Sequence, residues 1–171
     1  MELKATITAK GAILNGQSPA IIKGDLKAAM GEAVALLERE VKKKGRTPRG
    51  VFADQGGLVS TIYGEVVAFG TFFKGVVGHQ SKYGDVIEMG RRPGQKMPPA
   101  GAMLRWVEMK TGLSGKAAQQ VEFLIRRKIG QKGFEGAHMF EKTWRENQDQ
   151  LRKIFDRAGL NIAFHLSEDK S

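Results

Sequence analysis

The sequence predicts an α+β fold: a single domain in which a small antiparallel sheet packs against about three to four helices, with long projecting loops. Apolar residues recur at every second position in some stretches, as in strands, and at every third or fourth position in others, as in helices. Stretches rich in glycine and proline separate these patterns. The 171 residues suffice for one hydrophobic core. We therefore expect one domain over residues 1–171, with a frayed tail at 166–171.

The first quarter of the chain predicts a strand followed by a helix. Residues 2–9 alternate between apolar and polar side chains, which is typical of a half-buried strand. After a loop at 15–19, Asp25 is the expected N-cap of a helix over 25–43, because its carboxylate can accept a free N–H of the first turn. Gly45 then ends this helix.

The next segments mix strands and loops. Residues 45–57 hold four glycines and one proline, which predicts a loop. Residues 58–69 are rich in β-branched and aromatic residues, which favours a strand, and Gly64 within it marks a bulge or a close backbone approach. Residues 70–83 fit either a further strand pair or a projecting loop. Asp85 to Met89 predicts a short returning strand.

Two helices are expected after the double proline Pro98-Pro99, which imposes an extended entry because each proline biases its predecessor away from the α region. The first spans about 100–110. The second begins after Ser114 as its cap, carries an apolar stripe, and ends before Gly130.

A last helix is expected before Gly159, anchored on the core by Phe140, Trp144, Ile154 and Phe155. Beyond that glycine, apolar residues alternate from Leu160 to Leu166. This alternation predicts a final strand that carries His165 on its outer face.

The bulk composition narrows the possible classes. The net charge of +10 favours contact with polyanions: nucleic acid, an anionic membrane or an acidic protein surface, or else it serves solubility alone. The chain has no cysteine, which excludes disulfides and thiolate metal sites. No apolar run is long enough for a transmembrane helix, and the N-terminus lacks the apolar region of a signal peptide.

No catalytic or metal-binding pattern emerges, so we expect no enzyme activity, no catalytic residues, no metal and no cofactor. The carboxylates of Asp54 and Glu65 flank a loop and a strand without a shared role. His79 and His165 have no nucleophile at a recognisable spacing. The glycines do not form the phosphate-binding loop, which needs Lys and Ser/Thr after its second glycine.

Basic clusters are the stronger candidates for a binding surface. The residues that we single out for an interface or a DNA channel are Arg91, Arg92, Lys96, Lys42, Lys43, Lys44, Arg46 and Arg49. Phosphate contacts by such residues are independent of sequence and sensitive to salt. A cluster at a helix end can instead complement the helix dipole, whereas the pair Arg91-Arg92 lies in a turn without that explanation.

An apolar, glycine-rich stretch is the candidate subunit-contact loop. Its residues are Phe69, Phe72, Phe73, Val76 and Val77. They either form a buried strand pair or, on a projecting loop, require a partner to cover them.

The order of several short motifs resembles a known family. Tyr83 to Gly94 reads Y-G-D-V-I-E-M-G-R-R-P-G, and Met97-Pro98-Pro99 and Trp106-Val107 follow. This block resembles the centre of the tail-component, or tail-completion, family of long-tailed bacteriophages, in which a Y-A-x-x-V-E-x-G segment leads through R-P-x-x-P-P to a helix with a tryptophan. Gly84 stands where the family more often has alanine.

Further motifs extend the resemblance over roughly residues 25–158. Residues 47–60 resemble the family's Pro/Thr/Gly turn and strand entry, 123–133 its basic helix end and glycine turn, and 138–142 its H/P-F-M/F-E-K/P-A element. The link at 70–82 is longer than is usual in the family.

The resemblance implies a structural virion protein of the neck or tail, which completes the tail and joins it to the head connector. It implies a homo-oligomeric ring around the DNA channel, with six copies as the family suggests, and partners among the neck, connector, tail-terminator and tail-tube proteins. Genomic DNA passing through the channel would be contacted non-specifically, and no membrane is involved. The location would be the virion, after assembly in the host cytoplasm.

Two other classes stay open. Charge alone supports a non-specific nucleic-acid-binding protein. A toxin or small hydrolase has no supporting motif.

Overall fold

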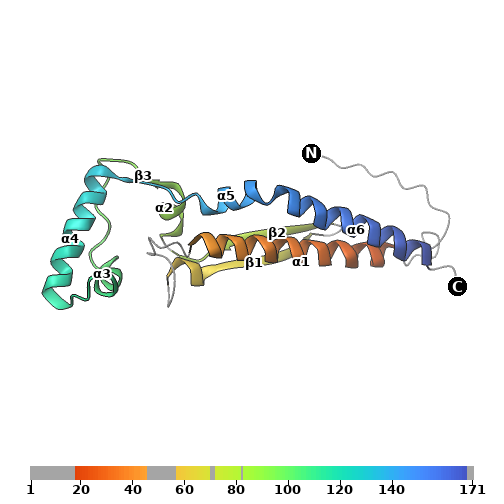
Figure 1. Cartoon of the computed structure of the whole chain (residues 1–171), viewed down its shortest axis with the longest axis horizontal. Coiled ribbons are helices and arrows are strands. Elements are labelled where there is room, and N and C mark those ends of the chain that lie inside the picture. Colours follow the sequence, from red (N-terminus) through yellow and green to blue (C-terminus); the bar gives the residue numbers. More distant parts are fainter. Residues whose placement is uncertain (1–17, 46–56, 70–71, 82, 169–171) are drawn as a thin grey trace. The chain divides into compact units, whose positions relative to one another are not determined.

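The computed structural model describes residues 18–45, 57–69, 72–81 and 83–168. Within these ranges the chain forms six α-helices, one 3-10 helix and two two-stranded sheets, so the predicted α+β class is confirmed (Figure 1). The sequence predicted fewer helices and one sheet. The predicted strand at 2–9 and most of the predicted loop at 45–57 lie outside the described residues.

Contacts divide the chain into two units, which are described separately. The described part of the first unit holds α1 as far as Glu40, the hairpin over 63–78 and the chain from Thr143 onward. The second unit holds 41–62 and 79–142.

The first unit is built on two long helices, α1 (Ser18–Gly45) and α6 (Gln148–Glu168). Their shared core consists of Ala29, Ala33, Leu36, Leu151, Ile154 and Ala158. Three of these six residues are alanines, and small side chains at a contact allow helix axes to approach closely. Figure 1 shows both helices running alongside the hairpin of β1 and β2.

The hairpin pairs β1 (Ile62–Phe69) with β2 (Phe72–His79) in an antiparallel sheet. A Cβ added at Gly64 or at Gly75 would lie 2.6 Å from a methyl group of Val34 on α1. Both glycines therefore let the strands approach the helix, and the predicted close backbone approach at Gly64 is confirmed. Residues 58–61, predicted as the start of the strand, form the 3-10 helix η2 (Leu58–Thr61).

Helix α1 begins seven residues before the predicted N-cap Asp25. Pro19 lies in its first turn, where the missing N–H has no intrahelical acceptor to lose and the fixed φ suits a helix. Pro19 therefore belongs to the helix and not to the predicted loop. The Asp25 side chain instead contacts the ring of His165 on α6, with 2.9 Å between Oδ2 and Nδ1.

The predicted strand over 160–166 is wrong, because α6 continues to Glu168. The alternation misled because only Ile162 of the alternating residues is buried, one helical turn after Ala158, whereas Leu160 and Phe164 are 72% and 57% exposed. Gly159 lies in the helix interior with nothing within 4 Å of an added Cβ, so it does not end the helix. Residues 166–168 of the predicted frayed tail are helical, and 169–171 lie outside the described residues.

The predicted last helix is divided at Asn147 into α5 (Met139–Glu146) and α6. The buried amide of Asn147 donates to the carbonyl of Thr143. Two of the predicted anchors are wrong, since Trp144 is 55% exposed and Phe155 is 38% exposed. Ile154 is buried in the core as expected.

The second unit contains α2 (Gly84–Met89), β3 (Gly90–Arg91), α3 (Leu104–Thr111), α4 (Gly115–Lys132) and β4 (Phe134–Glu135). Helices α3 and α4 pack together, with Val107 and Ala118 fully buried (Figure 1). Ser114 is the N-cap residue of α4, as predicted, although its side chain makes no capping hydrogen bond.

The predicted strand over Asp85 to Met89 is wrong, because these residues belong to α2. Gly84 and Ile87, three positions apart, are its buried residues, which is a helical spacing. The Asp85 carboxylate in the first turn interacts favourably with the positive end of the helix dipole. The helix ends at Gly90, whose φ of +79° suits glycine, and only Gly90 and Arg91 are extended as β3.

Candidate functional site

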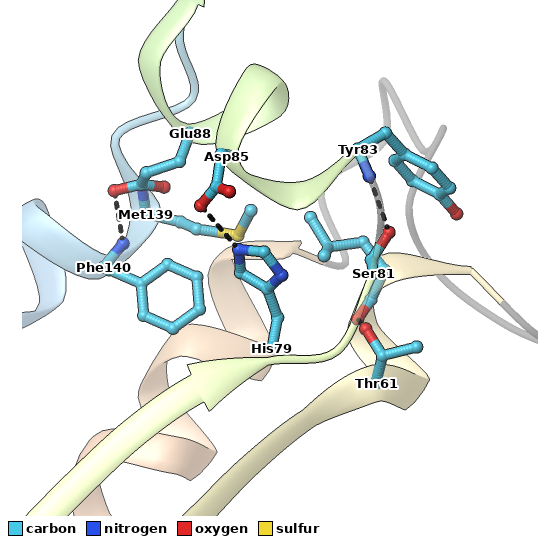
Figure 2. A network of polar contacts seen from close by, with 9 residues as sticks. Thr61, His79, Ser81, Tyr83, Asp85, Glu88, Met139 and Phe140 are labelled. Atoms are coloured by element: carbon cyan, nitrogen blue, oxygen red, sulfur yellow. Dashed lines mark hydrogen bonds and ion pairs between the residues drawn. The ribbon is translucent and has the colours of Figure 1, made fainter.

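A carboxylate clasp joins α2 to the start of α5. The Glu88 carboxylate accepts hydrogen bonds from the backbone N–H groups of Met139 (2.7 Å), Phe140 (3.0 Å) and Glu141 (3.2 Å). Figure 2 shows the Glu88 carboxylate beside the backbone of Phe140 at the start of α5. These three donors have no intrahelical acceptor, and a negative charge at a helix N-terminus is favourable. A residue 51 positions earlier in the chain thus caps this helix.

A short ladder continues this connection. β3 and β4 pair antiparallel, with Gly90 opposite Glu135 and Arg91 opposite Phe134. Gly136 faces the carbonyl of Glu88 so closely that an added Cβ would overlap it. The backbone N–H of Ala137 donates to the carbonyl of Ile87 at 2.8 Å. We name the contacts of residues 87–91 with residues 134–141 the clasp.

His79, the last residue of β2, is packed against the clasp. Its ring lies 5.9 Å from the Phe140 ring centroid, and Nε2 is 3.2 Å from Oδ1 of Asp85 (Figure 2). Gly84 leaves room for the ring, because a Cβ at that position would overlap it. The buried Nδ1 of His79 has no hydrogen-bond partner among the described residues.

Among the described residues, the hydrogen-bond partner of the His79 ring is Asp85 and not a hydroxyl group. The nearest serine in sequence, Ser81, uses its hydroxyl oxygen to accept the backbone N–H of Tyr83 at 3.4 Å. The His79–Asp85 contact instead joins the end of β2 to α2. No group of three His, Asp or Glu residues within the described ranges is arranged to hold a metal ion.

The two residues of the predicted pair Arg91-Arg92 have different surroundings in the structure. Arg91 is half-buried in β3, its Nη2 donates to the carbonyl of Lys96, and its buried Nε has no partner among the described residues. Arg91 therefore closes the turn over 91–96. Arg92 and Lys96 have exposed side chains and remain candidates for an interface.

The other predicted basic cluster lies only partly within the described residues. Lys42, Lys43 and Lys44 occupy the last turn of α1, where cations complement the helix dipole. Lys43 is exposed and its two neighbours are half-buried. Arg46 and Arg49 lie outside the described residues.

The predicted subunit-contact loop is largely a strand. Phe72, Phe73, Val76 and Val77 belong to β2, which corresponds to the strand-pair alternative for this segment. Phe72 is 63% exposed, and the other three are half-buried. The side chain of Phe69 lies outside the described residues. Phe72 is thus the most exposed of the described members of this group.

A buried ion pair between Glu122 and Arg126 was missed in the sequence. Glu122 is 3% exposed; its Oε1 accepts the backbone N–H of Met103 at 3.2 Å, and its Oε2 lies 3.8 Å from Nη1 of Arg126. Arg126 also donates from Nε to the carbonyl of Pro98 at 2.8 Å. The pair therefore holds the double-proline segment against α4. The sequence feature that could have predicted this pair is the position of Glu122, which lies one helical turn after Ala118 on the apolar face of α4.

A groove between α1 and α6 was also missed, because it depends on how two distant helices pair. It encloses about 610 Å³ and is lined by Glu32, Ala35, Leu36, Arg39, Gln150, Lys153, Ile154 and Arg157. Arg157 donates to Glu32 across it at 2.7 Å. The groove combines apolar residues with three cationic side chains.

No helix within the described residues is long and apolar enough to cross a membrane. Comparison of the chain with protein-family models, with curated proteins and with solved structures finds no match.

Proposed function

We propose that this protein is a structural component of the neck or tail of a long-tailed bacteriophage. It would complete the tail and join it to the head connector, as part of a ring around the DNA channel. The ring is a homo-oligomer, six-membered as the resemblance suggests. Its other partners are neck, connector, tail-terminator and tail-tube proteins, and the chain acts by binding and not by turnover.

The clasp is the observation that carries this proposal. Two blocks of the motifs behind the family resemblance, at 83–99 and at 123–142, lie apart in the sequence. In the structure these blocks bind each other: Glu88 caps α5, and β3 pairs with β4. Residues that meet in this way constrain each other's identity, which gives a physical reason for the motifs to occur together.

Further support comes from the glycines of the second motif block. Gly133 has a φ of +62°, and an added Cβ would overlap the carbonyl of Arg91 in the first block. Gly130 lies beside Met97, with 3.0 Å between an added Cβ and the Met97 Cγ. The glycine turn of the resemblance is therefore required by the Arg/Pro turn against which it packs.

The charge and the exposed groups fit a protein that works at interfaces. The net charge of +10 and the exposed Arg92 and Lys96 suit an acidic neighbour or the phosphates of passing DNA. Phe72 on β2 offers an apolar contact. Such a role places the protein in the virion, after assembly in the host cytoplasm.

Removal of the gene from a phage that encodes this chain tests the proposal. We expect filled heads and complete tail tubes that do not join, and a plasmid copy of the gene should restore joined particles. Electron microscopy and plaque counts are the measurements. Normal joined particles without the protein would refute the neck role.

A salt series separates the remaining alternative, a non-specific nucleic-acid-binding protein. That alternative predicts that the free protein binds duplex DNA with an affinity that falls steeply with salt. The neck role predicts assembly with tails and weak binding to free DNA.

A further inference from the structure

We propose that the groove between α1 and α6 receives the exposed face of α2 from a second copy of this chain. This inference rests on the proposed function, since the contact would link neighbouring copies in the ring. The contact is heterologous: the groove of one copy meets a different surface on the next, and such contacts close into rings.

The groove supplies an apolar floor with a cationic rim. Ala35, Leu36 and Ile154 contribute the apolar surface. At the rim, Arg157 pairs with Glu32, and this carboxylate partly balances the positive charge of the arginine. Lys153 is exposed and has no ionic partner among the described residues. A matching ligand therefore presents apolar side chains next to at least one carboxylate.

Helix α2 presents this combination. Asp85 and Val86 both border Met89, which follows them by four and three residues, and positions three and four residues apart are neighbours on a helix surface. Met89 is 79% exposed, the largest value among the exposed large hydrophobic residues of the described chain, and the Asp85 side chain is 91% exposed. Val86 is exposed between them. The opposite face, with Gly84 and Ile87, is buried.

The two surfaces complement each other in charge and polarity. Asp85 lies 3.2 Å from Nε2 of His79, but its side chain is 91% exposed, so the carboxylate can also approach Lys153 of the other copy while Met89 and Val86 cover the apolar floor. Opposite charges across an interface fix its register. A nucleic acid fits the groove less well. Its phosphates cannot form favourable contacts with the apolar floor, and the Glu32 carboxylate would repel them. One such contact is small and weak by itself, and ring closure multiplies its effect.

Cross-linking between two differently marked copies tests this contact, and the absence of cysteine in the chain makes each introduced thiol unique. One tagged chain carries Gln150→Cys in the groove, and an untagged chain carries Tyr83→Cys beside α2. A short bismaleimide then forms a mixed product that only an intermolecular contact can give. The control pairs Tyr83→Cys with Leu160→Cys, which lies outside the groove on α6 and is 72% exposed.

We expect the groove pair to give more mixed product than the control pair. Lys153→Glu in the groove chain, or Asp85→Lys in the α2 chain, should lower the yield on the order of fivefold, because attraction becomes repulsion. The two changes together should restore it. Melting curves verify that each variant is folded, and the restored pair distinguishes a lost contact from a damaged fold.

Equal yields for the groove pair and the control pair, or no recovery in the double exchange, would overturn the inference. If Lys153→Glu weakens binding to duplex DNA and leaves cross-linking unchanged, the groove binds nucleic acid and the inference is also wrong. Head–tail joining reports separately on the proposed function. Particles that require the protein but show no groove cross-link would contradict the groove contact alone.

Discussion

Glu88→Ala is the perturbation that best tests the clasp. Its carboxylate is the acceptor for three backbone N–H groups at the start of α5. Met139 is 2% exposed, so water cannot easily reach its N–H once the carboxylate is gone, whereas Glu141 is exposed and can be solvated. The loss therefore falls mainly on one buried donor and on the helix cap.

The magnitude follows from these two parts. A buried donor left without a partner costs about 1–3 kcal/mol, and the loss of a helix cap costs about 1 kcal/mol. We expect Glu88→Ala to lower the free energy of unfolding by about 2–4 kcal/mol, which at this chain length lowers Tm by roughly 5–15 °C. Glu88→Gln keeps one acceptor oxygen and loses the charge, so we expect about half that effect.

Urea unfolding followed by circular dichroism measures this change, with Glu135→Ala as the control that removes an exposed carboxylate from β4. Hydrogen exchange adds a local readout: the amides of Met139, Phe140 and Glu141 should exchange faster in Glu88→Ala than those of α4. If Glu88→Ala and Glu135→Ala unfold at the same urea concentration and exchange at these amides is unchanged, the carboxylate does not hold α5 and our reasoning is wrong.

Three further predictions concern stability and can be measured by the same urea unfolding. Gly133→Ala should destabilise by more than about 2 kcal/mol, because φ is +62° and the new Cβ overlaps a carbonyl, whereas Gly159→Ala in an open helix interior should stabilise by about 0.5–1 kcal/mol; equal effects would contradict the close approach. Leu151→Ala should lower the free energy of unfolding by about 2–5 kcal/mol and Trp144→Ala by less than about 1 kcal/mol, since only the leucine is buried. A larger loss for Trp144→Ala than for Leu151→Ala would show that the tryptophan belongs to the core. Arg91→Ala should cost about 1.5–3 kcal/mol through the lost charged hydrogen bond, against about 0.5 kcal/mol for the exposed arginine that follows it; similar small losses for both would show that neither arginine holds the turn.

Local signals predicted the elements that depend on local physics. The helix after Ser114 was predicted near its true start, because its apolar stripe repeats over several turns. Gly64 was identified as a close approach because a glycine interrupts a β-branched strand. Long periodic segments therefore carry enough information within the chain itself, whereas a single glycine does not always do so: Gly64 was interpreted correctly and Gly159 was not.

Short alternating stretches did not carry enough information to distinguish a strand from a helix. Residues 85–89 and 160–166 both look like strands, yet each is helical, because burial of a few side chains against distant elements outweighs the local pattern. The site was harder still. The capping role of Glu88 depends on a residue 51 positions away, and the groove depends on the pairing of α1 with α6, so no local window contains either.

The clasp also bears on how this chain can change in evolution. Because β3 and β4 are paired, the chain leaves at Arg91 and returns at Phe134 at the same place. The segment between them, which holds α3 and α4, therefore forms a long loop whose two ends, here called its base, are held together by the pairing of β3 with β4. Doubling the length of a flexible closed loop costs only about 0.6 kcal/mol. Insertions in the exposed connection between α3 and α4, residues 112–114, should therefore be tolerated, so related chains can differ in length there while the residues of the base and of the turn packed on Gly133 stay the same.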